Sequence, residues 1–296
     1  MWQRAQKGET LKPNLFIVGA PRCGTTSLWS YLKGHPEVFM SVEKELYFFD
    51  ADLWANQSWA PSLREYLKCF VAAGDRKKIG EATPSYLRSQ RAAKAIKTFS
   101  PQAQIIIMLR NPADVMHSLH SQGLRYGTES ISDFEAALEA DARRTGRELQ
   151  GYREFTNYPE QVQRYFELFG RESVHTIIYD DLQKNPAVVC QDVLRFLRVG
   201  LDFAAAFPQV NSNRQVRNFH LWAILREPPR PLRKISRALT PHWLRSRISH
   251  GLQNSNLAVR ARPPMDPELR QRLQEEFKPK LEQLSKLLGR DLSGWY

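Results

Sequence analysis

The sequence predicts an α/β fold, P-loop-containing, with a mainly parallel central sheet flanked by helices. Two observations carry this prediction: short apolar runs without polar alternation, and their alternation with segments of helical periodicity. A third is a loop bounded by glycines between the first apolar run and the helix after it. With 296 residues, 42% hydrophobic and 25% charged, the chain is long enough to bury a sizeable core. We expect a single domain over 1–296, with a basic, partly irregular segment at 214–262 packed on it.

The elements are read off in chain order from apolar runs, periodicity and breakers. Apolar runs predict strands at 15–18, 78–81, 105–109 and 174–178. Helical spacing, with glycine and proline as stop and start signals, predicts helices at 25–33, from Pro112 onward, at 188–197 and at 266–288. Within the last helix, Pro279 is expected to introduce a break, because proline removes a backbone donor.

Cysteine usage and hydropathy indicate a reducing compartment. The three cysteines are widely spaced (Cys23, Cys69 and Cys190), which favours neither a disulfide framework nor a clustered metal site. The first ten residues lack the apolar core of a signal peptide, and no run of about 18 apolar residues is present. We therefore expect a cytoplasmic protein, although a shortened chain would look the same.

The positive charge is concentrated in one segment. The chain has 43 Lys+Arg against 31 Asp+Glu, a net charge of +12. Between Arg214 and Arg262 there are eleven Lys/Arg and one acid, which is 11 − 1 = +10 of that total. A localised basic surface is thus expected, and wrapping of nucleic acid is not.

The loop from Gly19 to Gly24 has the spacing of a phosphate-binding P-loop. Backbone N–H groups of such a loop and the dipole of the following helix favour an anion, and Thr25, Thr26 and Ser27 add hydroxyl donors. A Walker A loop has Lys after its second Gly, whereas this chain has Thr25 there and carries its cation at Arg22. The loop therefore predicts phosphate binding and disfavours ATP or GTP hydrolysis.

A second phosphate element follows the strongest predicted strand. Arg110 stands at the carboxyl end of the 105–109 run, where open α/β sheets bind ligands. Ser118 lies about two helical turns further on. The planar fork of an arginine suits a phosphate group, and a serine adds a hydroxyl.

With these two elements in place, the chain resembles sulfotransferases that use 3′-phosphoadenosine-5′-phosphosulfate (PAPS). The resemblance runs over nearly the whole chain, and some of its pieces are closer to bacterial and heparan-sulfate-type enzymes than to cytosolic phenol or steroid enzymes. The matching pieces are FIVGAPRCGTTSLWSYL (16–32), KELYFFD (44–50), GEATPSYL (80–87), LRNPADVMHSLHS (109–121), YDDL (179–182) and FKPKLEQLSKLLGRDLSGW (277–295).

The resemblance implies a role for each matching residue in binding PAPS. Those of the first loop would hold the 5′-phosphosulfate: Arg22, Cys23, Gly24, Thr25, Thr26 and Ser27. Arg110 and Ser118 would bind the 3′-phosphate. Arg260 matches an arginine of a 3′-phosphate loop in heparan-type enzymes, although the neighbouring lysine of that loop is Ala258 here.

The resemblance also places a general base at Glu45. Sulfuryl transfer is an in-line displacement at sulfur, so a base must take the proton of the acceptor. The aromatic residues at 47–49 are expected to desolvate Glu45 and raise its pKa. The alternative is that Glu45 is only the ion-pair partner of Lys44 or of another cation.

Cations are expected to do the remaining charge work without a metal ion. Arg22 is the candidate for stabilising the leaving group, and Lys44 a second candidate near the transferring sulfonate. Glu81 and Ser85 are expected to line the acceptor cleft, with a structural cap as the alternative for Glu81.

The predicted acceptor is a hydroxyl or amine of a carbohydrate, lipid or small natural product. For 214–262 three interpretations stay open: a solvated face over apolar packing, a site for an anionic acceptor, or contact with an anionic membrane surface. Two alternative functions are a P-loop kinase and a non-catalytic protein that binds polyanions. The sequence does not predict an oligomeric state.

Overall fold

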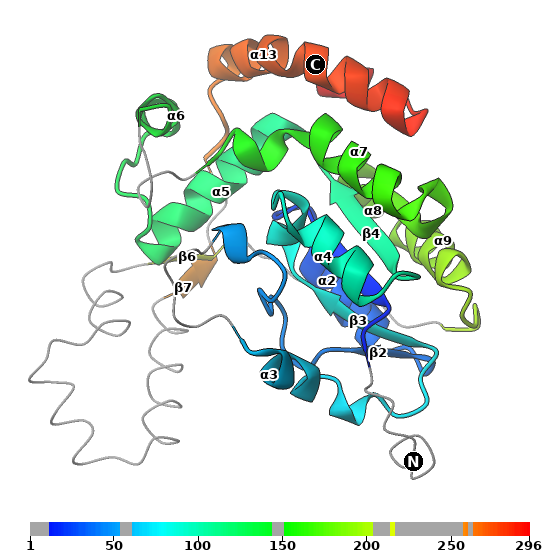
Figure 1. Cartoon of the computed structure of the whole chain (residues 1–296). Helices are drawn as coiled ribbons and strands as arrows, with labels where there is room; N and C mark the ends of the chain where they lie inside the picture. The colour runs from blue at the N-terminus through cyan, green and yellow to red at the C-terminus, as the bar shows by residue number, and fades with distance from the viewer. Residues whose placement is uncertain (1–11, 54–60, 144–150, 204–213, 217–256, 260–262) are drawn as a thin grey trace, which may run out of the picture. The chain divides into compact units, whose positions relative to one another are not determined.

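The structure, a computed structural model, describes residues 12–53, 61–143, 151–203, 214–216, 257–259 and 263–296 (Figure 1). Its contacts divide the chain into two compact units. The first comprises residues 1–116, 151–208 and 267–296, and the second comprises 117–150 and 209–266. The elements that carry most of the predicted site belong to the first unit.

The first unit is built around a five-stranded sheet in the order β2-β3-β1-β4-β5, with every neighbouring pair parallel. Its strands are β1 (Leu15–Gly19), β2 (Val38–Met40), β3 (Lys78–Ala82), β4 (Gln104–Leu109) and β5 (Val174–Ile178). All of β1 is buried, and so is β4 after its first residue, as expected of apolar strands covered on both faces. The predicted α/β fold is confirmed, and the short strand β2 is an addition to it.

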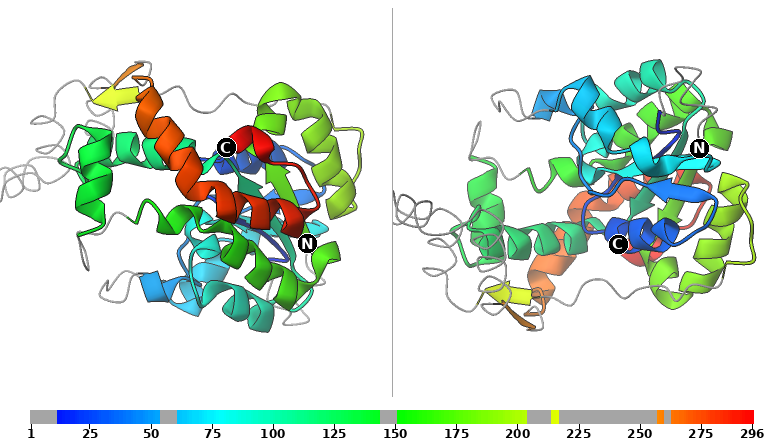
Figure 2. Two further views of the ribbon diagram at one scale, coloured as in Figure 1. Left: turned by 90° about the horizontal axis from the view of Figure 1, so that it is seen from above. Right: turned by 90° about the horizontal axis from the view of Figure 1, so that it is seen from below.

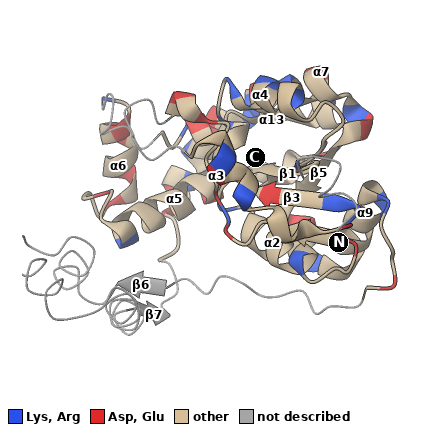
Figure 3. Cartoon of the chain, turned by 60° about the horizontal axis from the view of Figure 1, so that its bottom comes forward, with Lys and Arg blue, Asp and Glu red and all other residues tan. Residues whose placement is uncertain are grey.

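Helices cover both faces of this sheet. Figure 3 shows α4 and α7 on one side of it and α2 and α9 on the other. The helices of the first unit are α2 (Thr25–Lys33), α3 (Leu63–Lys68), α4 (Ala92–Phe99), α7 (Tyr158–Phe169), α8 (Tyr179–Lys184), α9 (Pro186–Leu197) and α13 (Pro267–Leu288), with a 3-10 helix η3 at Pro84–Leu87. Helix α5 (Pro112–Tyr126) begins in the first unit and continues into the second.

The predicted break in the last helix is wrong. Helix α13 runs without interruption through Pro279, which is exposed. Leu273 and Phe277 before the proline and Leu281 after it are all buried, and α13 lies against α7 (Figure 2). This packing outweighs the cost of about 3 kcal/mol that a proline imposes on a helix interior.

The described part of the second unit contains helix α6 (Phe134–Asp141) and an antiparallel pair, β6 (Arg214–Val216) with β7 (Leu257–Val259). Apart from these two strands, the basic segment 214–262 lies outside the described residues, and so does Arg260. The three interpretations of that segment therefore stay predictions. Among the residues that the structure does describe, no helix combines the length and apolar character needed to cross a membrane.

Candidate functional site

The two predicted phosphate elements meet at one edge of the sheet. Strands β1 and β4 are neighbours and parallel, so the loops that follow them leave from the same edge. The backbone N–H of Ala20 donates to the carbonyl of Met108 at 2.6 Å, which joins the first loop directly to the end of β4. Arg22 and Arg110, which follow these two strands, therefore belong to chain segments that lie side by side.

The shape of the first loop depends on its two glycines. A Cβ at Gly19 would lie 2.4 Å from the Cβ of Leu87, which leaves no room for a side chain. Gly24 caps α2 in the left-handed conformation, at φ 87°, and a Cβ there would lie 3.2 Å from the ring of Tyr179. Arg22 also has a positive φ, of 64°. The chain thus turns sharply within the loop, as a cradle for an anion requires.

Both arginines act electrostatically on Cys23, which lies in the first loop. Burial raises the pKa of its thiol to about 12, while Arg110, a hydrogen bond with Tyr158 and Arg22 act in the opposite direction. The thiol is fully buried and donates to the carbonyl of Pro21 at 3.4 Å. Of Cys23, only the backbone can therefore serve a ligand, and the positive potential of both arginines reaches this point of the loop.

Arg110 is held by partners from three elements. Its guanidinium lies over the ring of Tyr179 at 4.7 Å from the centroid, and its Nη2 is 3.7 Å from Oδ2 of Asp114. Its backbone carbonyl accepts a hydrogen bond of 3.1 Å from Tyr158. The two tyrosines had no predicted role, and only the YDDL piece marked the position of Tyr179.

The C-terminal GRDLSGW piece fastens the ends of β4 and β5. The amide of Asn111 donates to the carbonyl of Trp295 at 2.9 Å, and the indole of Trp295 donates to Asp180 at 2.7 Å. Arg290 forms an ion pair with Asp181 at 2.5 Å. Residues almost 200 positions apart therefore support the backbone beside Arg110.

The candidate base lies in a cluster with both candidate cations. Nζ of Lys44 is 2.9 Å from Oε1 of Glu45, and the hydroxyl of Tyr47 donates to Oε2 of the same carboxylate. The side chain of Lys44 is 14% exposed and that of Glu45 is 41% exposed. Arg22 acts electrostatically on both of them. The ion pair with Lys44, which was the alternative interpretation of Glu45, is thus present, and the carboxylate keeps access to solvent.

The expected rise in the pKa of Glu45 is not found. Burial alone raises the pKa of Glu45, but Lys44, the hydroxyl of Tyr47 and Arg22 together outweigh it, so the pKa lies below its ordinary value. Burial lowers the pKa of Lys44, with Glu45 opposing and Arg22 adding to the effect. Charge in the cluster therefore dominates over desolvation at Glu45.

Glu81 does not line a cleft, contrary to the prediction. It is fully buried at the end of β3, where its carboxylate accepts hydrogen bonds from Tyr66 (2.5 Å), Thr83 (2.8 Å) and Tyr86 (3.3 Å). Burial raises its pKa to about 7, against the effect of these three hydrogen bonds. Ser85 is also buried and donates to Asp50 at 2.5 Å.

The predicted phosphate ligands with hydroxyl groups lie on two helices, α2 and α5. Thr25 and Ser27 are buried in the first turn of α2, and Thr26 is half-buried there. Ser118 is buried on α5, in the part of that helix that belongs to the second unit.

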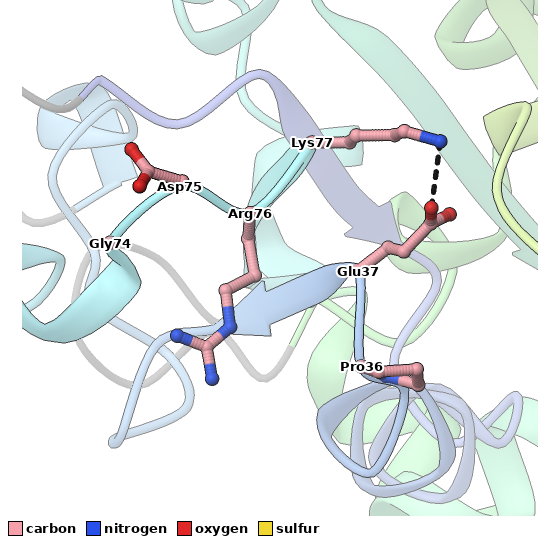
Figure 4. A pocket seen from close by; sticks show the side chains of 6 residues that line it. All are labelled: Pro36, Glu37, Gly74, Asp75, Arg76 and Lys77. Carbon is pink, nitrogen blue, oxygen red and sulfur yellow. Dashed lines mark ion pairs between the residues drawn. The ribbon is translucent and has the colours of Figure 1, made fainter. Parts of the chain in front are cut away.

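A shallow cavity lies at the opposite edge of the sheet and is not part of this site (Figure 4). Its volume is about 410 Å³, and Glu37 and Lys77, which precede β2 and β3, form an ion pair of 2.7 Å across it. The other lining residues are Pro36, Gly74, Asp75 and Arg76.

Sequence comparison decides the family. The profile described as "Sulfotransferase domain" matches residues 12–285. The chain belongs to the sulfotransferase family. As a member of it, the chain is an enzyme, a sulfotransferase, as its motifs had predicted; this decides against the kinase and against the non-catalytic alternative.

Solved structures and curated proteins agree with this assignment. A sulfotransferase from Alicyclobacillus acidocaldarius superposes with a TM-score of 0.73 at 27% identity, over 96% of this sulfotransferase and 98% of that chain. Human heparan sulfate glucosamine 3-O-sulfotransferase 6 is 31% identical over 124 residues, 42% of this chain and 34% of the relative. The bifunctional heparan sulfate N-deacetylase/N-sulfotransferase 1 of Caenorhabditis briggsae is 24% identical over 198 residues, 62% of this chain and 22% of the relative. The sulfotransferase thus matches about a fifth to a third of the length of such curated relatives.

Proposed function

We propose that this sulfotransferase transfers a sulfuryl group from PAPS to a hydroxyl or amine of a carbohydrate, lipid or small natural-product acceptor. The observation that carries the proposal is the convergence of Lys44 and Glu45 on Arg22 of the glycine-bounded loop, with Arg110 directly after the neighbouring strand β4. Cations suited to a phosphosulfate and a solvent-accessible carboxylate suited to a base thus share one sheet edge.

The residues present fit PAPS as donor. Residues 22–27, at the end of the first loop and the start of α2, would hold the 5′-phosphosulfate with their backbone N–H groups, their hydroxyls and the guanidinium of Arg22. Arg110 and Ser118 are the proposed ligands of the 3′-phosphate, with Arg260 as a third. PAPS supplies a sulfuryl group joined to a phosphate that leaves readily. The positive potential that Arg22 and Arg110 both impose on Cys23 supports the binding of an anion with two phosphate groups.

Glu45 is the proposed base, and the cluster around it suggests how its basicity is set. While Lys44 pairs with it, the pKa of Glu45 stays low. A sulfonate offered to Lys44 and Arg22 would compete for both cations, and burial would then act on Glu45 with less opposition. Glu45 would gain basicity only when the donor is in place. Arg22 and Lys44 would meet the negative charge that develops on the leaving oxygens.

The names of the curated relatives support a proposal for the class of the acceptor. Two of them are named for heparan sulfate, so we propose a carbohydrate acceptor first, with an anionic one as the preferred case. The basic segment 214–262 is the proposed contact for such an acceptor or for an anionic membrane surface. We propose no nucleic-acid partner.

The test is transfer of label from ³⁵S-PAPS into a panel of sugars, lipids and alcohols, with a matched pair of variants. Glu45→Gln removes the proposed base, and Glu43→Gln removes an exposed carboxylate two positions away. We expect Glu45→Gln to lose at least about a hundredfold in kcat, with unchanged binding of adenosine 3′,5′-bisphosphate, and Glu43→Gln to match the parent. Equal turnover in all three proteins would contradict the assignment of the base.

The 3′-phosphate site is tested by calorimetry. The parent should bind adenosine 3′,5′-bisphosphate more tightly than adenosine 5′-monophosphate, and more tightly than ATP or heparin. Arg110→Ala should bring the first two affinities together. If the variant discriminates between them as the parent does, Arg110 does not contact the 3′-phosphate.

A further inference from the structure

Residues 44–50, which we call the Glu45 loop, belong to no helix or strand. Two side-chain hydroxyls that follow β3 in the chain hold the backbone of the loop. The N–H of Leu46 donates to Oγ1 of Thr83 at 3.1 Å, and the N–H of Phe48 donates to the hydroxyl of Tyr86 at 3.0 Å. One backbone bond adds to these, from the N–H of Glu45 to the carbonyl at residue 82, at 2.9 Å. The conformation of the loop therefore depends on where these hydroxyls point.

Both hydroxyls donate their own hydrogen to Glu81. Thr83 donates to Oε2 at 2.8 Å, and Tyr86 lies 3.3 Å from each carboxylate oxygen. Each hydroxyl is thus a relay, accepting from the loop on one side and donating to the buried carboxylate on the other. The third donor to Glu81, Tyr66, stacks its ring on Phe48 at 4.3 Å between centroids. No hydrogen bond from the loop to its hydroxyl is among those that the structure describes.

We propose that Glu81 is a positioning residue for sulfuryl transfer, whose ionised carboxylate orients Thr83 and Tyr86 so that they hold the loop carrying Glu45. The inference rests on the proposed function, because it gives Glu45 the role of base. An ionised carboxylate only accepts hydrogen bonds, so both hydroxyls must turn their hydrogens toward it and their lone pairs toward the loop. A protonated carboxyl or an amide in the same place donates to one hydroxyl and frees that hydroxyl to turn.

Folding alone gives no reason for an ionised group at this place. Burial works against the charged form of Glu81, and Asp50 adds to the effect. The other titratable groups that face Glu81 are Tyr66, Cys69, Tyr86 and Tyr165. An amide of the same shape would fill the space without a buried charge. What the carboxylate adds is acceptance from all three hydroxyls at once.

Two tyrosine variants form a matched pair that separates this role from mere packing. Tyr86→Phe and Tyr66→Phe each remove one hydroxyl from Glu81, but only the hydroxyl of Tyr86 also accepts from the loop. The measurements belong at about pH 9, where Glu81 is ionised. We expect Tyr86→Phe to lose hydrogen-exchange protection at the amide of Phe48 and between about tenfold and a hundredfold in kcat, at unchanged KM for PAPS. Tyr66→Phe should keep both the protection of the Phe48 amide and the kcat of the parent.

Variants of Thr83 provide a second test of the proposal if Tyr86→Phe does not fold. Thr83→Ser keeps the relay hydroxyl and should keep the protection of the Leu46 amide, whereas Thr83→Val should lose it. Binding of adenosine 3′,5′-bisphosphate serves as the check of folding. Parental amide protection and kcat in both Tyr86→Phe and Thr83→Val would overturn the proposal, and so would equal losses in the two tyrosine variants. If the parent itself transfers no sulfuryl group, the proposed function fails, and amide exchange still decides whether Glu81 holds the loop.

Discussion

Replacing Glu81 with glutamine should stabilise the protein above neutral pH while slowing the reaction. Burial raises the pKa of Glu81 from its ordinary value of 4.5 to about 7. Between these pH values the folded protein holds a proton that the unfolded chain has released, so the free energy of unfolding falls as the pH rises. At about 1.4 kcal/mol for each tenfold change, this loss amounts to about 3 kcal/mol once the pH exceeds 7.

The assay is urea-induced unfolding of the parent and Glu81→Gln at about pH 5 and about pH 9. Comparing the two proteins cancels the other titrating groups. Little difference is expected at the lower pH, and the variant should be more stable by up to about 3 kcal/mol at the higher pH. A difference in stability that is the same at both pH values would show that Glu81 does not titrate in this interval. A variant that is more stable and as active as the parent would refute the positioning role.

Three further outcomes follow from the same geometry. Gly24→Ala should cost about 1–2 kcal/mol of stability and weaken binding of adenosine 3′,5′-bisphosphate in calorimetry, because its φ is positive and the ring of Tyr179 is close; Gly289→Ala, also at positive φ but with nothing within 4 Å of its Cβ, should leave that affinity unchanged. Tyr179→Leu should weaken the same binding by about threefold to fivefold through the lost cation–π contact, and Tyr179→Phe should not. The kcat/KM of the parent for PAPS should fall below about pH 7 with the protonation of Glu81, because it reports the free enzyme, in which the pKa of Glu45 lies below its ordinary value; a profile of kcat/KM against pH in which Glu81→Gln keeps that fall would contradict this.

Local sequence signals predicted the strands and the first loop well, because each depends on a short stretch of chain. The apolar runs of β1 and β4 need cover on both faces wherever they occur, and the glycines at 19 and 24 mark a turn that other residues do not fit. The break at Pro279 failed because the packing of α13 on α7 is a tertiary effect that local signals do not carry.

The electrostatics of the site were predicted poorly for a similar reason. The aromatic residues of the KELYFFD piece were expected to surround Glu45, but Phe49 is buried and Phe48 stacks on Tyr66, while Tyr47 gives Glu45 a hydrogen bond. Burial still raises the pKa of Glu45, but Lys44, the hydroxyl of Tyr47 and Arg22 together outweigh it, so the shift has the opposite direction to the predicted one. Glu81, in the GEATPSYL piece, was expected to line the acceptor cleft or to act as a structural cap, but it is fully buried. Two of its partners, Thr83 and Tyr86, lie in the same GEATPSYL piece, and Tyr66 comes from α3. That these hydroxyls turn toward a buried carboxylate is a tertiary effect that no local pattern shows.

The two glutamates at this end of β3 are perturbed in opposite directions, and the difference matches their proposed work. Glu45 is kept ionised by cations that a donor's sulfonate would draw away, so its affinity for a proton can rise when the donor binds. Glu81 has no cation among the causes of its shift, and the three hydroxyls that donate to it are what opposes the effect of burial on its charged form. Those hydroxyls include the two that carry the Glu45 loop. Loss of the charge on Glu81 would therefore relieve an energetic cost and, in the same step, release the loop that holds the base.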